Sequence, residues 1–333
     1  MQSKPGRKAA LKKAHVSIIS PATAKANNGN WQTAIRWANC LSDYRIDLRQ
    51  QWDGTPCDAM IALHARRSAA SLADFHARFP QRPSVLVLTG TDLYRDIRHD
   101  EEARRSLRLA SRLVLLQEAG LQELDAALRD KASVIYQSAP PLLAETPRPD
   151  REILRVVMIG HLREEKDPMT YLRAAALVDP DRARLLHIGG ALDPELALQA
   201  QAAQRRLPHY RWLGALPHEA TRRELAQSDL LVLTSRMEGG ANVIIEAVTS
   251  GVPVLATDIP GNRGMLGSGY AGYFPVGDHD MLASMIARTI SDRAYLDTLK
   301  QQCARRAPLF SPRQEQAAVR QLMHALLAAP QLS

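Results

Sequence analysis

The feature that most constrains the fold is an alternation along almost the whole chain, in which short apolar runs are separated by segments of helical character. Such alternation is typical of a parallel sheet with crossover helices. The strands expected in the first half are Val16–Ser20, Arg45–Leu48, Ala59–Leu63, Val85–Thr89, Leu113–Leu116 and Ser133–Tyr136. Those expected in the second half are Leu154–Ile159, Leu185–Ile188, Trp212–Leu213, Leu230–Leu233 and Val254–Ala256.

A proline-rich stretch interrupts this alternation near the middle of the chain. Four prolines fall between Ala139 and Asp150, and the strand pattern restarts after them. With 333 residues, of which 45% are hydrophobic, the chain is long and apolar enough for two domains with separate cores. The sequence therefore predicts an α/β protein with two Rossmann-like domains, residues 14–145 and 150–310, behind a basic tail of residues 1–13.

The unusual polar clusters follow expected strands. They are Pro21–Asn30, His64–Arg67, Thr89–Asp92, Gly160–Lys166 and Ser235–Glu246. In doubly wound sheets, ligands bind beyond the carboxyl ends of the strands. We therefore expect these clusters to face a ligand cleft between the two domains.

Two glutamates, Glu238 and Glu246, flank a Gly-Gly turn in the most informative cluster. The apolar run Leu230–Leu233 before the turn is typical of a buried strand, and Ala241–Val248 after it is typical of a helix. A helix that starts in a glycine loop directs free backbone N–H groups into that loop, which favours an anion there. Carboxylates beside an anion site predict a nucleotide sugar, with its diphosphate at the amides and its hydroxyl groups at the acids.

The loop Gly160–Lys166 repeats this arrangement, because it leaves a strand and enters a helix whose first residue is expected to be Pro168. Its cations, Arg163 and Lys166, are suited to stabilise a departing diphosphate. The alternative is a charged surface loop whose own glutamates pair with these cations.

Cations and helix starts also mark the polar clusters of the first half. The segment Lys25–Asn30 has the composition of an anion-binding helix start, although an ordinary Asn-capped turn has the same residues. Arg66 and Arg67 stand where a helix begins, and the macrodipole disfavours cations there unless an anion or solvent compensates them. The neighbouring His64 is a candidate base, phosphate-binding residue or packed core residue.

The cluster Thr89–Asp92 offers two hydroxyl groups and a carboxylate that is suited to cap a helix. Arg95 and Arg98 follow it on one helical face, which turns either toward the ligand or toward water.

Charge and composition narrow the range of partners. The net charge is +8 and the isoelectric point is near 9.6, which suits an anionic partner. The arginines are spread over the chain and no zinc-finger, RRM-type or helix-turn-helix pattern occurs, so nucleic acid is not expected. No apolar run reaches the length of a membrane span, and no signal peptide is expected. The three cysteines suit a reducing cytoplasm, and we expect a cytoplasmic protein without a metal or cofactor.

Taken in order, these residues resemble the GT-B glycosyltransferases of family 4 over about residues 14–328. The similarity is most specific in the second half, at Gly160–Lys166, Leu186–Gly190, Trp212–Pro217 and the Glu-x7-Glu of Glu238 and Glu246. The resemblance implies a GT-B fold with a last helix that crosses back to the first domain, here residues 311–329.

Position by position, the resemblance also implies a donor site for a UDP-sugar, either UDP-N-acetylglucosamine or UDP-glucose. Lys166 and Arg163 would hold the diphosphate, Glu246 the ribose hydroxyls and Glu238 the sugar. The other donor-side positions are Gly239, Gly240, Ala241 and Asn242 at the helix start, and Gly214 and Leu216 at the base.

A closer resemblance is to the selenosugar synthases of selenoneine biosynthesis, through Ile19–Ala22, Asn28–Thr33, Leu63–Ser68, Leu88–Tyr94 and Asp258–Arg263. That family joins the sugar of a UDP-sugar to selenophosphate through a C–Se bond, which implies a functional link to a selenophosphate synthetase. The implied acceptor residues are Lys25, Asn28, Gly29, Asn30, His64, Arg66, Arg67, Thr91 and Arg98, and the implied catalytic residues are His64, Lys166 and Glu238. Selenophosphate is a small polyanion, which agrees with the cationic first-half loops.

Two departures from family 4 bear on the donor site. His161 stands after the loop glycine, where most members carry Arg, and Gly239-Gly240-Ala241 replaces Gly-Phe-Gly, which leaves more room at the sugar. The sugar and the stereochemical outcome stay open. The alternatives are a conventional hydroxyl acceptor and a non-catalytic nucleotide-sugar binder.

Overall fold

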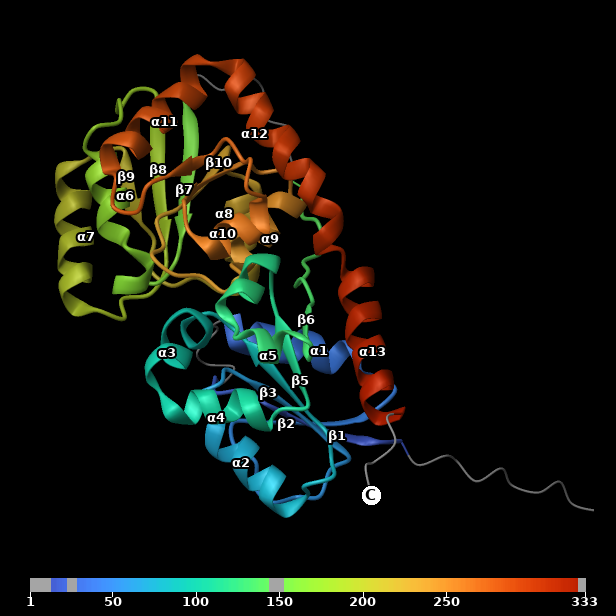
Figure 1. The fold of residues 1–333 in the computed structure, drawn as a ribbon. Helices are drawn as coiled ribbons and strands as arrows, with labels where there is room; N and C mark the ends of the chain where they lie inside the picture. The colour runs from blue at the N-terminus through green and yellow to red at the C-terminus, as the bar shows by residue number, and fades with distance from the viewer. Residues whose placement is uncertain (1–12, 23–28, 144–152, 329–333) are drawn as a thin grey trace, which may run out of the picture.

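Two α/β domains, each built on a six-stranded parallel sheet, make up the computed structural model, which describes residues 13–22, 29–143 and 153–328 (Figure 1). The strand orders are β2-β1-β3-β4-β5-β6 and β12-β11-β10-β7-β8-β9. The second order is that of a Rossmann domain, and the first is the flavodoxin-like variant of the same doubly wound arrangement. The predicted fold class is confirmed.

The first domain contains the strands β1 (His15–Ile19), β2 (Arg45–Arg49), β3 (Ala59–Leu63), β4 (Ser84–Leu88), β5 (Arg112–Leu115) and β6 (Ala132–Val134). Its helices are α1 (Gly29–Cys40), α2 (Ala69–Arg78), η2 (Asp92–Asp96), α3 (Ile97–His99), α4 (Glu101–Leu109), η3 (Glu118–Glu123) and α5 (Ala126–Arg129). Every residue of β3 and β4 is buried. A parallel strand covered by helices on both faces requires such a continuous apolar run.

The second domain contains the strands β7 (Leu154–Ile159), β8 (Ala183–Ile188), β9 (Tyr210–Trp212), β10 (Leu230–Leu233), β11 (Val254–Thr257) and β12 (Tyr273–Phe274). Its helices are η4 (Glu164–Lys166), α6 (Pro168–Ala175), α7 (Pro194–Arg206), α8 (His218–Ala226), α9 (Asn242–Thr249), α10 (Pro260–Leu266), α11 (His279–Ser291), α12 (Arg293–Arg306) and η5 (Ala307–Phe310). The last helix, α13 (Pro312–Ala328), runs down from the second domain and lies along α1 of the first (Figure 1).

Helix α13 belongs to the core of the first domain although it ends the described chain. Its residues Val319 and Met323 are fully buried among apolar residues of α1 and of the first sheet. Its buried Glu315 accepts hydrogen bonds from Arg36 and from the Trp37 indole at 3.1 Å each, and from the Ser138 amide at 2.9 Å. This carboxylate therefore ties α13 both to α1 and to the segment that leaves the first domain.

Two local features differ from the sequence-based expectation. The strand β12 has only two residues and was not predicted from the sequence. It forms by pairing with β11 at the edge of the sheet. The segment after Thr91 forms a π-helical turn rather than an Asp-capped helix. The Asp92 carboxylate instead accepts hydrogen bonds from the amides of Thr89 at 2.9 Å, Gly90 at 2.8 Å and Ala65 at 2.9 Å, and so joins the ends of β3 and β4.

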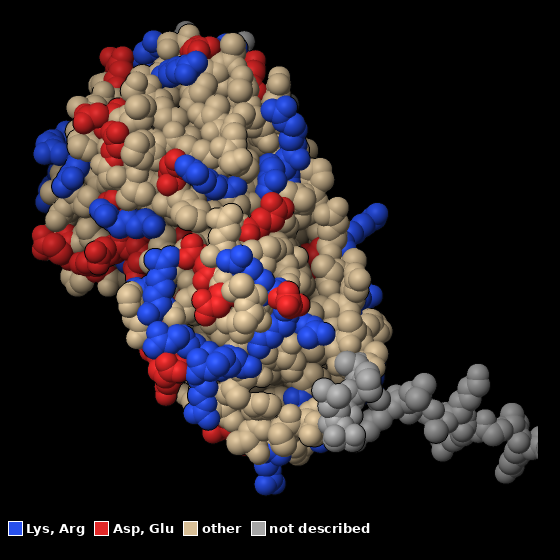
Figure 2. Space-filling model, viewed as in Figure 1, with Lys and Arg blue, Asp and Glu red and all other residues tan. Residues whose placement is uncertain are grey.

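Among the described helices, none is long and apolar enough to cross a membrane. On the face shown in Figure 2, Lys and Arg lie over both domains with Asp and Glu among them, and the densest group lies on the first domain. The basic tail of residues 1–13 lies almost entirely outside the described residues.

Candidate active site at the junction of the two domains

The second domain places its two glycine loops at the point where the strand order reverses. The strands β7 and β10 are parallel neighbours, and the chain continues from them toward opposite edges of the sheet. Ligands of doubly wound sheets bind at such a switch point. The loops Gly160–Lys166 and Thr234–Ala241 follow these two strands, so the topology brings together the segments that the sequence singled out.

Lys166 and Glu238, 72 positions apart in the chain, meet side by side. The Lys166 ammonium donates a hydrogen bond to Oε1 of Glu238, and the Ser235 hydroxyl donates to the same oxygen at 2.6 Å. The two charged side chains are only 17% and 11% exposed. The pair therefore holds a cation and a carboxylate in fixed positions beside a helix start.

Backbone contacts fix the two loops relative to each other. The Arg236 amide donates to the Glu165 carbonyl at 2.9 Å, and the Thr234 hydroxyl donates to the Lys166 carbonyl at 2.8 Å. A loop pair tied in this way is preorganised, which strengthens its electrostatic effect on a bound ligand.

Close backbone approaches require glycine around Glu238. A Cβ on Gly261 would lie 1.9 Å from the Glu238 carbonyl oxygen. A Cβ on Gly239 would lie 2.4 Å from the Thr89 carbonyl oxygen and 2.6 Å from Gly90 Cα. Since Thr89 and Gly90 directly follow β4 of the first domain, the Glu238 loop touches the opposite domain directly.

Glu246 lies farther along α9, in a basic setting. Its carboxylate is 2.7 Å from Nε2 of His218 and 4.0 Å from Nε of Arg222, both on α8. The loop before α8 contains Gly214, with a φ of +69°, and the half-buried Leu216. The structure therefore brings the residues predicted for the ribose and the base to neighbouring elements.

Two histidines, one buried and one half-buried, order the ends of β7, β8 and β9. The fully buried His187 contacts the Gly160 carbonyl at 3.0 Å through Nε2 and the Tyr210 hydroxyl at 3.2 Å through Nδ1. Burial lowers its pKa to about 4, so the ring is neutral. The Gly190 amide donates to Nδ1 of His161 at 3.0 Å, and burial lowers the pKa of His161, which leaves a neutral ring with its proton on Nε2.

The starts of two helices from different domains meet at this junction. A Cβ on Gly29, the first residue of α1, would lie 3.3 Å from the side-chain nitrogen of Asn242, the first residue of α9. Helix N-termini carry partial positive charge, so two of them together favour an anion more than one does. Gly29, Asn30 and Asn242 were expected at the site; Lys25 and Asn28 lie outside the described residues.

The first-domain side of the junction contains a strained histidine. His64, directly after β3, is 2% exposed and has a φ of +74°, a conformation that residues with a side chain rarely adopt. Its Nδ1 accepts from the Arg67 amide at 3.3 Å, and its Nε2 lies 3.1 Å from the Thr91 hydroxyl. Burial lowers its pKa, in part against the charges of Asp92 and Asp96. Strain of this kind is concentrated at functional sites.

The arginines of this domain divide into two groups. Arg66 lies 3.3 Å from the buried Asp96, near His64, and Arg67 is exposed beside it. Arg98 instead pairs with Glu123 of η3. The structure therefore brings His64, Thr91, Arg66 and Arg67 together, whereas Arg98 has a separate partner.

Several residues of the junction were not predicted from the sequence. They are Ser235, His218, Arg222, Glu165 and Asp96, whereas Arg95 had been predicted to face either the ligand or water. Ser235 and Glu165 lie inside loops that were predicted to face the ligand, so their position in the sequence could have identified them as candidate site residues. Asp96 had no such signal, because only the turn of η2 brings it next to His64 and Arg66. Arg163, which was predicted, lies 3.9 Å from Glu165.

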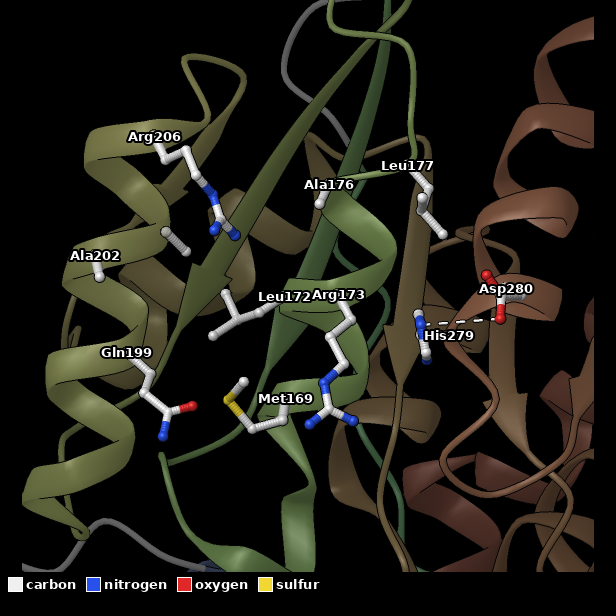
Figure 3. Close-up of a pocket in the computed structure, with 11 residues that line it drawn as sticks. Met169, Leu172, Arg173, Ala176, Leu177, Gln199, Ala202, Arg206, His279 and Asp280 are labelled. Carbon is white, nitrogen blue, oxygen red and sulfur yellow. Dashed lines mark ion pairs between the residues drawn. The ribbon is translucent and has the colours of Figure 1, made fainter.

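A separate pocket lies on the outer side of the second domain, between α6 and α7 and the start of α11 (Figure 3). Its floor includes Met169 and Leu172, and Arg173 and Arg206 lie at its sides. It contains none of the site residues predicted from the sequence. Over the described ranges, no group of three His, Cys, Asp or Glu side chains is placed to hold a metal ion.

The second domain is similar in sequence to known glycosyltransferases. Residues 145–308 match the family model of glycosyl transferases group 1. The UDP-Gal:alpha-D-GlcNAc-diphosphoundecaprenol alpha-1,3-galactosyltransferase of Escherichia coli is 26% identical over 155 residues, which are 44% of this chain. The match spans 38% of that protein's length.

Solved structures share the whole two-domain arrangement. Sucrose-phosphate synthase from Thermosynechococcus elongatus has a TM-score of 0.76 and 17% identity, with 95% of this chain and all of that chain covered. Anabaena HepE in complex with UDP-glucose has a TM-score of 0.74 and 17% identity, with 94% of this chain and all of that chain covered. At these identities the likeness shows a common fold.

Proposed function

We propose that the protein transfers a sugar from a UDP-sugar to selenophosphate, on the premise that residues 145–308 match the glycosyl transferases group 1 family model and that the chain has a two-domain GT-B fold. The observation that carries the proposal is the Lys166–Glu238 pair, which lies at the switch point of the second sheet, on a loop that touches the first domain. A transferase needs its donor contacts next to its acceptor domain, and this loop meets that requirement.

The donor half of the proposal is supported by the arrangement of Lys166, Glu238 and Glu246. A cation beside a helix start suits a diphosphate, and a mostly buried carboxylate suits hydroxyl groups. The complex of HepE with UDP-glucose agrees with a UDP-sugar as donor. We propose UDP-N-acetylglucosamine or UDP-glucose as the donor, bound without a metal because Lys166 supplies positive charge at the leaving group.

The acceptor half is supported by the sequence resemblance to the selenosugar synthases and by the charge of the first domain. His64, Arg66 and Arg67 follow β3, and Arg66 and Arg67 offer guanidinium groups at that strand end. A small polyanion such as selenophosphate is a suitable ligand for guanidinium groups. A cytoplasmic location and supply by a selenophosphate synthetase belong to the same proposal.

In the proposed reaction, selenium attacks the anomeric carbon as the C–O bond to the β-phosphate breaks, and the bonding electron pair leaves with UDP. Water then cleaves the P–Se bond, which releases phosphate and leaves a 1-seleno-sugar. The anionic nucleophile needs little help from a base, so Glu238 is assigned to a sugar hydroxyl and His64 to acceptor binding. Lys166 stabilises the negative charge that develops on UDP.

The test is UDP release from each donor with and without selenophosphate, together with mass analysis of the product. We expect release that depends on selenophosphate and a product that contains selenium at the anomeric carbon. Lys166→Met should lower the rate about 100-fold, the size of effect typical for loss of one charge-stabilising donor. The exposed Lys300 provides the matched control, Lys300→Met.

Release of UDP with a hydroxyl acceptor, but not with selenophosphate, would instead assign the protein to conventional glycosyl transfer. Binding of UDP-sugar without turnover on any acceptor would indicate a nucleotide-sugar binder.

A further inference from the structure

A buried carboxylate that the reaction above does not use lies at the acceptor side of the junction. Asp96 ends η2, is 4% exposed, and has one oxygen, Oδ2, without a hydrogen-bond partner among the described residues. Buried carboxylates are costly unless they are compensated, so an incompletely satisfied one at a domain junction needs a reason.

Three nitrogen groups surround this carboxylate. Nε of Arg95 donates to Oδ1 at 3.1 Å, and Nε of Arg66 lies 3.3 Å from Oδ2. Nε2 of His64 is 3.9 Å from the same Oδ2. Arg66 lies in the turn after β3 and Arg95 lies in η2, so Asp96 is the group that joins the two guanidinium groups.

Most of the hydrogen-bond capacity of these arginines remains available. A guanidinium has five N–H donors, and the contacts to Asp96 use only the Nε side of each. Both side chains are 45% exposed. Beyond Asp96, the ion pair that Arg95 makes among the described residues is 3.6 Å long, to Glu165 of the second domain, and a partly exposed ion pair of this length is weak.

The charges at this place favour an added anion. Arg66 and Arg95 share the Asp96 carboxylate, and the exposed Arg67 lies beside them. Asp92 is the second carboxylate near His64, so three guanidinium groups against two carboxylates leave one positive charge in excess. Glu165 balances this excess only across the domain junction. A small tetrahedral polyanion would accept from both guanidinium groups more strongly than Glu165 does, because several charge-assisted hydrogen bonds replace one long contact.

We propose that Asp96 is a positioning residue that holds Arg66 and Arg95 on either side of a site for a small tetrahedral polyanion. When the anion binds, Arg95 exchanges its ion pair with Glu165 for hydrogen bonds to the anion. This inference deepens the proposed function, since it assigns the selenophosphate site to named side chains. Asp96 itself does not touch the anion, and removal of its charge acts through the two arginines.

The first experiment measures anion affinity directly. Thiophosphate, an oxidation-stable analogue of selenophosphate, is titrated by calorimetry into the full chain with UDP present. Asp96→Asn keeps the side-chain shape and should weaken thiophosphate about tenfold, and Arg66→Ala should do at least the same. Glu165→Gln should strengthen it about twofold to threefold by removing the competitor. The exposed residues Asp130 and Arg105 supply the controls Asp130→Asn and Arg105→Ala, which should change nothing.

The second readout separates positioning from folding. UDP affinity depends on the second domain and should be unchanged in Asp96→Asn, whereas the KM for the acceptor should rise about tenfold with kcat nearly constant. If Asp96→Asn loses UDP binding through misfolding, the exposed Arg66→Ala decides the question. Unchanged thiophosphate affinity in Arg66→Ala, or no thiophosphate binding by the unaltered protein, overturns the inference.

Failure of this site and failure of the proposed function give different results. Thiophosphate binding that responds to Asp96→Asn, without selenophosphate-dependent UDP release, supports the anion site and rejects selenophosphate as acceptor. If turnover depends on selenophosphate but the acceptor KM is the same in Asp96→Asn, in Arg66→Ala and in the unaltered protein, the proposed function is supported and the site is rejected.

Discussion

Glu238 and Glu246 have the same functional group in different electrostatic surroundings. Glu238 accepts from the Lys166 ammonium and the Ser235 hydroxyl, at the contact with the first domain. Glu246 lies on α9 against His218 and Arg222 of α8. We therefore propose that the two carboxylates bind different parts of the donor, with Glu238 nearer the transferred sugar and Glu246 nearer the ribose.

Replacement of Glu246 tests this assignment. Glu246→Ala should weaken UDP binding about tenfold to a hundredfold, because one or two hydrogen bonds to a charged group are lost. Calorimetric titration with UDP measures the effect. Glu219→Ala is the control, since Glu219 lies on α8 and its side chain is 89% exposed. An unchanged UDP affinity in Glu246→Ala would remove the ribose assignment.

At the scale of elements, the ends of β7, β8 and β9 act as one unit. His187 of β8 joins the Gly160 carbonyl after β7 to the Tyr210 hydroxyl of β9, and the Trp212 indole donates to the Gly189 carbonyl at 2.9 Å. A Cβ on Gly189 would lie 1.9 Å from the Gly160 carbonyl oxygen, so the backbones pack without space between them. The loop that carries Lys166 starts from this rigid edge.

The neutral His187 makes the stability of this unit depend on pH. Its pKa is about 4 in the folded protein and about 6.5 in the unfolded chain, so the unfolded state binds the proton more tightly. Stability is complete above pH 6.5 and is lost as the pH falls toward 4. Between pH 7.5 and pH 5 this residue alone should cost about 2 kcal/mol of unfolding free energy.

Urea unfolding of the unaltered protein and of His187→Gln at these two pH values isolates the contribution, because other titrating groups affect both proteins alike. The difference in stability between the two should shrink by about 2 kcal/mol at pH 5. A difference that is constant with pH would show that His187 does not titrate between the two states.

At the scale of the whole molecule, the backbones of the two domains approach each other closely where they meet. Gly239 touches Thr89 and Gly90, and a Cβ on Gly240 would lie 2.8 Å from Cβ of Leu116. The Tyr136 hydroxyl also donates to the Gly264 carbonyl of the second domain at 3.1 Å. Contacts this close leave no room for added atoms, so the approach of the domains depends on glycine.

Addition of one methyl group at Gly239 should push the two domains apart where they touch. Gly239→Ala places a Cβ 2.4 Å from the Thr89 carbonyl oxygen, and backbone atoms cannot move aside locally. We expect kcat to fall at least tenfold with little change in UDP affinity, because misplacement by about 1 Å is costly only when both substrates must meet. Steady-state kinetics and UDP titration measure the two effects. Gly269→Ala, where a Cβ meets nothing within 4 Å, is the control.

The sequence alone determined the fold class and singled out the loops that we propose to bind the donor. Apolar runs such as Ala59–Leu63 and Leu230–Leu233 predicted buried parallel strands with correct or nearly correct bounds, since burial on both faces demands a continuous apolar run. The loops that contain Lys166 and Glu238 were predicted because the chemistry of a doubly wound sheet concentrates at strand ends. Both predictions depend on residues that are close together in the sequence, so they can be made from the sequence alone.

Only the tertiary structure decided which side chains meet. The pairing of Lys166 with Glu238 follows from the neighbouring positions of β7 and β10, and the partners of Asp96 follow from the turn of η2. The contact between Gly239 and Thr89 depends on how two domains approach each other, and α13 completes the first core from the far end of the chain. Contacts between residues distant in sequence depend on the order of strands in the sheet and on packing. The hydrophobic pattern within a single segment predicts neither.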